Sequence, residues 1–302
     1  MAVVMNPFPD ADELIEREQL SYWQDVRKRF FRNKIAVIGL VMLAMMVLVA
    51  IFGPWLTPGD YKSARNIPDL PRRMFNEAGI FGTDQLGRNL WHRCVRGIGI
   101  SLRLAVSVAL ISTVVGMVFG GLAGYLGGWV DSVISRFIEM LYAIPYVLIG
   151  IAAIAIFGSS FWTVMFTLIF TGWVNTARLF RASVLQIRSN DYIESARATG
   201  ATTKRILLSH VLPNALPPII VSIAFSISGA ILAESIYSFL GIGFIEPTPA
   251  LGVMIRDART QFQPYPHLLW VPASILIWLT LSIVFIGDGL RDALDPKMRG
   301  VD

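Results

Sequence analysis

The sequence predicts an all-α integral membrane protein with six transmembrane helices. Two observations lead to this prediction. The 302-residue chain is 54% hydrophobic and only 16% charged, whereas soluble globular domains carry about 25% charged residues. Uncharged stretches also recur along the chain at the length that roughly 30 Å of hydrocarbon requires. A chain of this composition is expected to bury most of its surface in lipid rather than in a water-soluble core.

The composition argues against several other classes of protein. The net charge of +5 is modest, and the basic residues form no continuous patch with interleaved aromatics, so we expect no nucleic-acid partner. Cys94 is the only cysteine, which excludes an internal disulfide and a thiolate metal site. The three histidines are scattered, and no Gly-x-x-x-x-Gly-Lys-Ser/Thr loop occurs. We therefore expect no catalytic residues, no bound metal and no cofactor on this chain.

The N-terminal part, residues 1–34, lacks the layout of a cleaved signal peptide. Its second half, residues 14–34, places aromatic residues on one face and basic residues on the others, which predicts an amphipathic helix lying on the membrane lipid. The alternative is a helix packed on protein. Residues 35–97 form the next part, a first span at 35–56 followed by a long polar loop.

The core, residues 98–290, contains the other five predicted spans. The second span has glycines at small-xxx-small spacing, which predicts close approach to another helix. Pro145 predicts a kink in the third span. A polar loop precedes the last span, and a polar tail, residues 291–302, ends the chain. The five spans cover residues 98–127, 133–157, 161–184, 216–240 and 268–286.

A polar, helix-forming segment at 188–214 lies between the fourth and fifth spans. Asp191 and Glu194 have the spacing of a capping box and predict the start of a short helix. Gly200 predicts its end, because glycine adopts the left-handed conformation after a helix at little cost. One interpretation of this segment is an ordinary basic loop between two spans.

A second short helix is expected after this glycine. Thr202 or Thr203 is suited to cap it, and Pro213 is expected to end it, because proline lacks an amide donor. The segment therefore predicts a helix, a glycine turn and a second helix.

Six spans place both termini on one side of the membrane. Basic residues favour the cytoplasm, and they occur in the N-terminal part, in the segment 188–214 and in the tail. The loop 57–97 is also basic and argues against this orientation, but long loops weaken the rule. We therefore expect cytoplasmic N- and C-termini.

The segment 188–214 resembles the EAA loop of the membrane subunits of ABC importers. Glu194-Ser-Ala, Gly200 and Leu212-Pro-Asn match that pattern, with Ser195 in place of an alanine. His210 stands at an apolar position of the pattern, where the peptide-transporting branch often has histidine. The resemblance implies that this loop docks on an ATPase subunit. The residues that it assigns to coupling are Glu194, Ser195, Ala196, Gly200, Ala201, Arg205, His210, Leu212 and Pro213.

A turn-rich motif before the second span resembles the same branch. Asp84 in this turn is suited to accept hydrogen bonds from neighbouring amides, which also describes an ordinary surface turn. Asn89 replaces the usual aspartate of the family, and Ala250 stands where the branch usually has tryptophan. The residues assigned to this extracellular motif are Gly82, Thr83, Asp84, Gly87 and Arg88.

Two further stretches, 234–243 and 287–296, complete a resemblance that covers nearly the whole chain. The chain resembles the C-type permease subunit of bacterial peptide and nickel ABC importers. That resemblance implies the type I importer permease fold with cytoplasmic coupling helices, a place in the bacterial inner membrane, and half of a path for di- or oligopeptides. Nickel or another small solute is the alternative cargo.

The implied partners are a homologous second permease subunit, two ATPase subunits that bind ATP and Mg, and an extracellular or periplasmic substrate-binding protein. A different class, the ion-driven secondary transporters, is a remote alternative. It would require coupling-ion sites at broken helices and inverted repeats, and the sequence shows neither.

Two carboxylates fall within predicted spans, where burial is costly unless the group is paired. Glu139 lies one helical turn after Arg136 and is expected to form an ion pair with it. Glu234, with Ser235 and Ser238, is a candidate for the substrate path. The alternative is that Glu234 only forms hydrogen bonds with the serines around it.

Overall fold

The computed structural model describes residues 21–57 and 81–295, and its regular elements are helices, which confirms the all-α prediction. In chain order they are α2 (Tyr22–Arg32), α3 (Lys34–Leu56), α4 (Leu90–Leu126), α5 (Gly128–Ala143), α6 (Tyr146–Phe157), α7 (Phe161–Arg188), α8 (Asp191–Ala198), α9 (Thr203–Ile206), the π-helix η1 (Leu207–Val211), α10 (Leu212–Leu240), α11 (Leu251–Ala258) and α12 (His267–Leu294).

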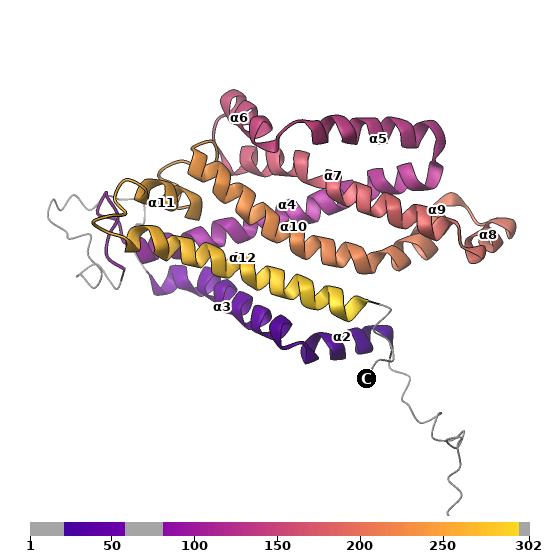
Figure 1. Cartoon of the computed structure of the whole chain (residues 1–302), viewed down its shortest axis with the longest axis horizontal. Helices are drawn as coiled ribbons and strands as arrows, with labels where there is room; N and C mark the ends of the chain where they lie inside the picture. The colour runs from indigo at the N-terminus through magenta and orange to yellow at the C-terminus, as the bar shows by residue number, and fades with distance from the viewer. Residues whose placement is uncertain (1–20, 58–80, 296–302) are drawn as a thin grey trace, which may run out of the picture.

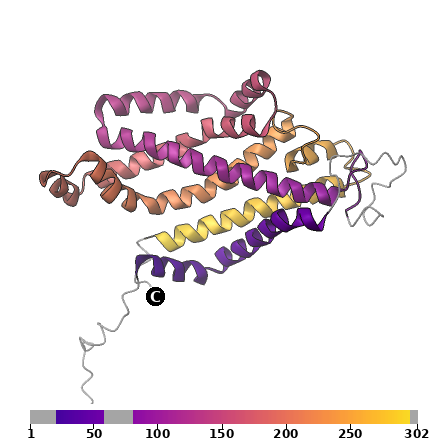
Figure 2. The same ribbon diagram turned by 180° about the vertical axis from the view of Figure 1, so that it is seen from behind.

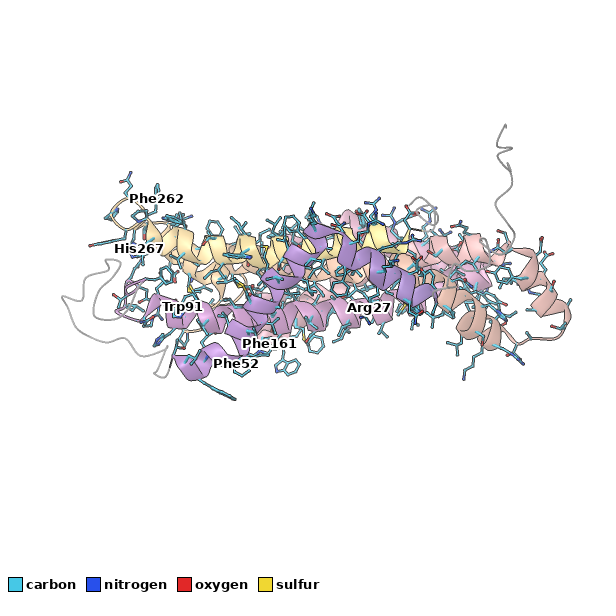
Figure 3. All side chains as sticks on the ribbon, turned by 90° about the horizontal axis from the view of Figure 1, so that it is seen from below. Arg27, Phe52, Trp91, Phe161, Phe262 and His267 are labelled. Carbon is cyan, nitrogen blue, oxygen red and sulfur yellow. The ribbon has the colours of Figure 1, made fainter. Side chains whose placement is uncertain are left out.

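The long helices run roughly along the long axis of the molecule (Figure 1). α3 and α12 lie on one side of the bundle, and α5 and α6 on the other. α8 and α9 project at one end, which we call the α8 end, and α11 lies at the opposite end, the α11 end. The view from behind shows α4 running between these two ends across the bundle (Figure 2). The side-chain view places Trp91, Phe262 and His267 toward the α11 end, with Arg27 of α2 in the other half (Figure 3).

Among the described residues, four helices are long and apolar enough to cross a membrane. They are α3, α4, α12 and the continuous stretch Thr203–Leu240, and a fifth span results if α5 and α6 count as one. α7 has 28 residues but is more polar, with Asn175 and Arg178 near its middle. The structure therefore supports a multi-pass membrane protein with four or five apolar spans.

The kink expected at Pro145 is a complete break. α5 ends at Ala143, α6 begins at Tyr146, and the two helices meet at an angle of 83°. Proline has no amide hydrogen for the helical ladder, and it disfavours helical geometry at the preceding residue. Ile144, the residue before it, has extended backbone angles.

The glycines of α4 allow close packing against α7, as their spacing predicts. A Cβ added at Gly116 would lie 2.7 Å from the Cβ of Thr176, and one added at Gly124 would lie 2.9 Å from the carbonyl oxygen of Arg181. Both distances are too short for an unstrained contact, so larger side chains would separate α4 from α7.

Two predicted loops contain more helix than expected. α4 begins at Leu90 rather than at residue 98, because the side chain of Asn89 accepts a hydrogen bond from the amide of His92 at 3.0 Å and caps the helix. The stretch 241–267 contains α11, whose Leu251 and Val253 are fully buried. The stretch 241–267 is polar on average, which predicted a loop, but some of its apolar side chains are buried and form the inner face of α11.

Residues 14–20 of the expected amphipathic helix lie outside the described part of the chain. In α2, Val26 is buried in a cluster with Ala293 and Leu294 of α12, so one side of the helix packs on protein. Trp23 and Phe31 are 53% and 56% exposed.

Candidate functional site

The α8 end contains the first of the two short helices expected there, but its N-terminal cap differs from the prediction. Asn190, not Asp191, is the N-cap residue, and no side chain caps the helix. The expected capping box of Asp191 and Glu194 is therefore wrong. The helix starts one residue earlier than the pattern requires, so Glu194 is not at the third helical position.

Gly200 ends this helix as predicted. Its φ is +85°, and its amide donates to the carbonyl of Arg197 at 3.0 Å. The amide of Ala201 donates to the carbonyl of Ala196, also at 3.0 Å. These two bonds form a Schellman motif, in which the left-handed residue is usually glycine. The turn between α8 and α9 thus depends on the conformational freedom of Gly200.

The second helix is capped by Thr202, whose hydroxyl accepts a hydrogen bond from the amide of Arg205 at 3.4 Å. The prediction that Pro213 ends this helix is wrong. Helical structure continues from α9 through η1 into α10, and Pro213 lies in the first turn of α10. Proline is tolerated in a first turn, and the wider π-turn just before it already departs from the α-helical hydrogen-bond ladder.

The apolar side of this segment is anchored in the bundle. Ile193, Ile206 and Val211 are 0%, 1% and 0% exposed. They belong to one cluster with side chains from the ends of α4, α7 and α10, which include Tyr125 and Val184. The segment that contains α8 and α9 therefore packs directly against three long helices.

The polar side of the segment faces outward. Glu194, Ser195 and Arg205 are exposed. The hydroxyl of Ser195 donates to the carbonyl of Asp191 at 3.0 Å within the same helix. Within the described residues, the side chains of Glu194 and Arg205 form no hydrogen bond or ion pair.

His210, Leu212 and Pro213 lie where the segment joins α10. The ring of His210 lies 6.5 Å from that of Tyr192, centroid to centroid. Leu212 packs at the margin of the buried cluster, and Pro213 is exposed. The structure thus brings the residues assigned to coupling together at one end of the molecule.

The residues assigned to the extracellular motif form a tight turn at the α11 end. Gly82 and Gly87 have φ of +66° and +73°. One carboxylate oxygen of Asp84 accepts from the amides of Leu86 and Arg88 at 2.9 and 3.0 Å. Thr83 pairs with Asn89 across the turn and is fully buried. The hydrogen bonds expected of Asp84 are confirmed.

An ion-pair network that the sequence did not reveal joins this turn to the loop before α11. Arg88 donates to Asp84 at 2.7 Å and forms a bidentate pair with Glu246. Arg93, which is fully buried, donates to the same Glu246 carboxylate at 2.8 Å. Glu246 therefore connects the turn, the start of α4 and the loop after α10.

The charges in this network influence one another's protonation. Burial raises the pKa of Glu246, but the hydrogen bond from Arg88 and the charge of Arg93 outweigh it, so the net pKa lies below the ordinary 4.5. Burial lowers the pKa of Arg88, but the hydrogen bond to Glu246 and the charge of Asp84 leave it above the ordinary value. Both groups are therefore charged at neutral pH.

Glu234 lies inside the bundle and is fully buried. Its carboxylate accepts from Ser238 at 2.8 Å, from Ser101 of α4 at 3.1 Å and from Ser235 at 3.4 Å. Of the two alternatives for this group, the structure shows the serine contacts, and Ser235 and Ser238 are buried with it. These contacts tie α10 to α4.

Glu139 forms the expected ion pair with Arg136 at 3.0 Å. Both side chains are largely exposed, at 62% for Glu139 and 81% for Arg136. Both residues belong to α5, which lies on the side of the bundle opposite α3 and α12 (Figure 1).

Together, the long apolar helices define a multi-pass membrane protein. The family model described as "Binding-protein-dependent transport system inner membrane component" matches residues 116–300, and a second, described as "N-terminal TM domain of oligopeptide transport permease C", matches residues 21–73. The chain belongs to the family of binding-protein-dependent transport system inner membrane components.

Known proteins agree with this assignment. The Bacillus subtilis dipeptide transport system permease protein DppC is 38% identical over 290 residues, 94% of this chain and 89% of the relative. The B. subtilis oligopeptide transport system permease protein OppC is 34% identical over 288 residues, 95% of this chain and 93% of the relative. A chain of the MetNI methionine ABC transporter has a similar fold, with a TM-score of 0.56 and 20% identity over 67% of this chain and 96% of that chain.

Proposed function

We propose that this chain is one of two homologous permease subunits of an ATP-driven importer, and that it forms half of the path for di- or oligopeptides. Family membership supports the importer, and the names of the two Bacillus relatives support the peptide cargo. Two partner ATPase subunits bind ATP and Mg, and a substrate-binding protein delivers the peptide. The chain itself performs no bond-making chemistry.

One observation carries the coupling role. At the α8 end, two short helices around Gly200 have an apolar side that packs into the bundle and an exposed polar side, on which the side chains of Glu194 and Arg205 form no hydrogen bond or ion pair within the described chain. A partner ATPase is the proposed occupant of that polar side. When ATP closes the two ATPase subunits, α8 and α9 move with them and displace the ends of α4, α7 and α10. This displacement alternates access to the path.

The proposal includes six spans, formed by α3, α4, the broken pair α5 and α6, α7, α10 and α12. The α8 end and both termini are then cytoplasmic, and the α11 end is external. This orientation predicts opposite labelling of two exposed positions, Gln263 and Thr203, each replaced by cysteine in a Cys94→Ser background. A membrane-impermeant maleimide applied to intact cells or spheroplasts should label the Gln263→Cys variant and spare the Thr203→Cys variant until the membrane is permeabilised. The reverse pattern would overturn the orientation.

The cargo is tested in the host. Deletion of the gene should abolish uptake of labelled di- and tripeptides, and the intact gene supplied in trans should restore it. Uptake of nickel, measured in parallel, should not change. Loss of nickel uptake with normal peptide uptake would show instead that nickel is the cargo.

A further inference from the structure

A groove of about 820 Å³ lies between α5 and α7. Its walls include Ser135, Glu139 and Tyr142 of α5, and Asn175 and Arg178 of α7. Buried contacts of Ile138 with Trp173 and Ala177 hold the two helices together along one edge. The volume falls within the range of about 300–1,000 Å³ that is usual for small-molecule sites.

The polar walls of this groove lie deep along the helix. Asn175 is the fifteenth of the 28 residues of α7, which places it roughly 20 Å from either helix end at the usual rise of 1.5 Å per residue. Arg178 lies one turn nearer the α8 end, and its guanidinium carbon lies 5.2 Å from the centroid of the Tyr142 ring. If α7 crosses the membrane, Asn175 is near its middle.

The polar side chains on the groove walls have few hydrogen-bond or ionic partners within the described chain. In the described residues, the amide of Asn175 has no hydrogen-bond partner, and Arg178 has only the face of Tyr142. Glu139 is 62% exposed although Arg136 pairs with it. Placing a charged or amide group against hydrocarbon has a high free-energy cost. Within membranes, such residues therefore usually face the bundle interior or a water-filled cavity.

The outward face of α3 lacks these polar groups. The outward positions of α3, such as Ile38, Leu48 and Ile51, are more than half exposed and entirely apolar, as lipid contact requires. The other intramembrane acid, Glu234, is fully buried among serines and offers no access to a passing solute.

We propose that the groove between α5 and α7 is the wall of the translocation path that contacts the imported peptide. Glu139 pairs with the peptide's terminal ammonium, Arg178 with its terminal carboxylate, and Asn175 with its backbone amides. This inference rests on the proposed function, and it names the side chains through which this chain meets its cargo. It assigns no such role to Glu234, Ser235 or Ser238.

The first test is thiol labelling of the assembled transporter in membranes. Asn175→Cys in a Cys94→Ser background should react with a charged methanethiosulfonate reagent, which modifies only thiols in contact with water. A saturating tripeptide, supplied with its binding protein and ATP, should protect it. The matched control, Leu48→Cys on α3, should remain unlabelled.

Two results would overturn the proposal. Absence of labelling at Asn175→Cys, with or without ATP, means that lipid or a partner subunit covers the groove. Labelling without protection by peptide means that the groove is wet but does not contact the cargo. If the unmodified transporter imports no peptide at all, the proposed function fails instead, so the two failures are distinguishable.

The second test separates contact with the peptide from a structural role. Glu139→Gln should lower the maximal import rate of a peptide with a free amino terminus by about tenfold, which corresponds to one charge-assisted hydrogen bond. Import of the N-acetylated peptide should not change. Arg136→Gln breaks the same ion pair without altering the groove wall, and should import both peptides at the normal rate. Equal losses for the two peptides, or in the two variants, would contradict the contact.

Discussion

The charged side chains differ in burial and in pairing between the two ends of the molecule. At the α11 end, Arg88 and Arg93 are 5% and 0% exposed and share the carboxylate of Glu246. At the α8 end, Glu194 and Arg205 are exposed, and their side chains have no bonding partner in the described chain. Among the described residues, the charges at the α11 end are therefore paired within this chain, whereas Glu194 and Arg205 at the α8 end are unpaired, which supports the proposal that a partner ATPase covers them.

If this contrast is correct, the largest effect on stability should come from the α11 end. Glu246→Ala leaves the two buried guanidinium groups with Asp84 as their one shared carboxylate among the described residues, and removing one side of a buried ion pair costs about 3–5 kcal/mol. Thermal unfolding of the detergent-solubilised transporter should therefore occur at a clearly lower temperature.

The control for this variant is Arg136→Ala, which breaks an ion pair whose two side chains are 81% and 62% exposed. Exposed pairs contribute about 0–1 kcal/mol, so unfolding should be almost unchanged. If both variants unfolded alike, the network at the α11 end would have no special structural role.

The second largest effect should appear at the α8 end, in transport rather than in stability. Gly200 has a φ of +85°, and no atom lies within 4 Å of a Cβ placed on it. Space is therefore available, and conformation alone limits substitution. Gly200→Val forces a β-branched residue into left-handed geometry, at a cost of at least about 1–2 kcal/mol, and should reorient α9 relative to α8. Peptide uptake should fall severalfold while the unfolding temperature stays close to that of the unmodified protein.

Gly200→Asn is the matched control, because asparagine visits the left-handed region more readily than other residues with a Cβ. It should retain most of the uptake. If Gly200→Val transported normally, the orientation of the two short helices would not matter for coupling.

The sequence predicted much of this contrast but not all of it. Uncharged runs located the long helices, since lipid demands continuous apolar stretches, and the glycine turn followed from conformational preference alone. The Arg93–Glu246 contact joins residues 153 positions apart, and no local pattern reveals such a pair. A signal was nevertheless present, because Arg93 lies close to a long apolar stretch where an unpaired charge is costly.

The errors at the α8 end also have a physical origin. The capping box required the helix to begin after Asp191, but it begins after Asn190. Pro213 was expected to end a helix, but a π-turn precedes it and proline occupies a first turn. Both errors concern helix boundaries, which packing against neighbouring helices can move by a residue or a turn without changing the element itself.

A third and smaller effect is the pH dependence of the α11 end. The pKa of Glu246 is lowered in the folded protein, so this residue contributes stability above its ordinary pKa of 4.5, and the contribution disappears as the pH falls through the lower folded value. Asp257 acts in the opposite direction: burial and its contact with Glu246 raise its pKa, so its contribution is lost as the pH rises through that raised value.

Glu246→Gln isolates the first of these effects. At neutral pH this variant should unfold at a lower temperature than the unmodified protein, and the gap should narrow as the pH is lowered below 4.5, the ordinary pKa of the glutamate. A gap that stays constant from neutral to acidic pH would mean that the ionised carboxylate does not stabilise the folded state.

The smallest expected effect on stability is at Glu194. A capping-box glutamate would stabilise its helix by roughly 0.5–2 kcal/mol, but no such box forms here, so Glu194→Ala should unfold at the normal temperature. Any loss should appear in the association with the ATPase subunits, where one solvent-exposed ion pair is worth at most about 1 kcal/mol. Co-purification of the ATPase subunits measures that association.

If Glu194→Gln binds them as poorly as Glu194→Ala, the ATPase recognises the charge; if Glu194→Gln binds normally, a hydrogen bond is enough. A lower unfolding temperature for Glu194→Ala, with unchanged ATPase binding, would show instead that this side chain belongs to the fold of the chain, and the contrast between the two ends would not hold at this residue.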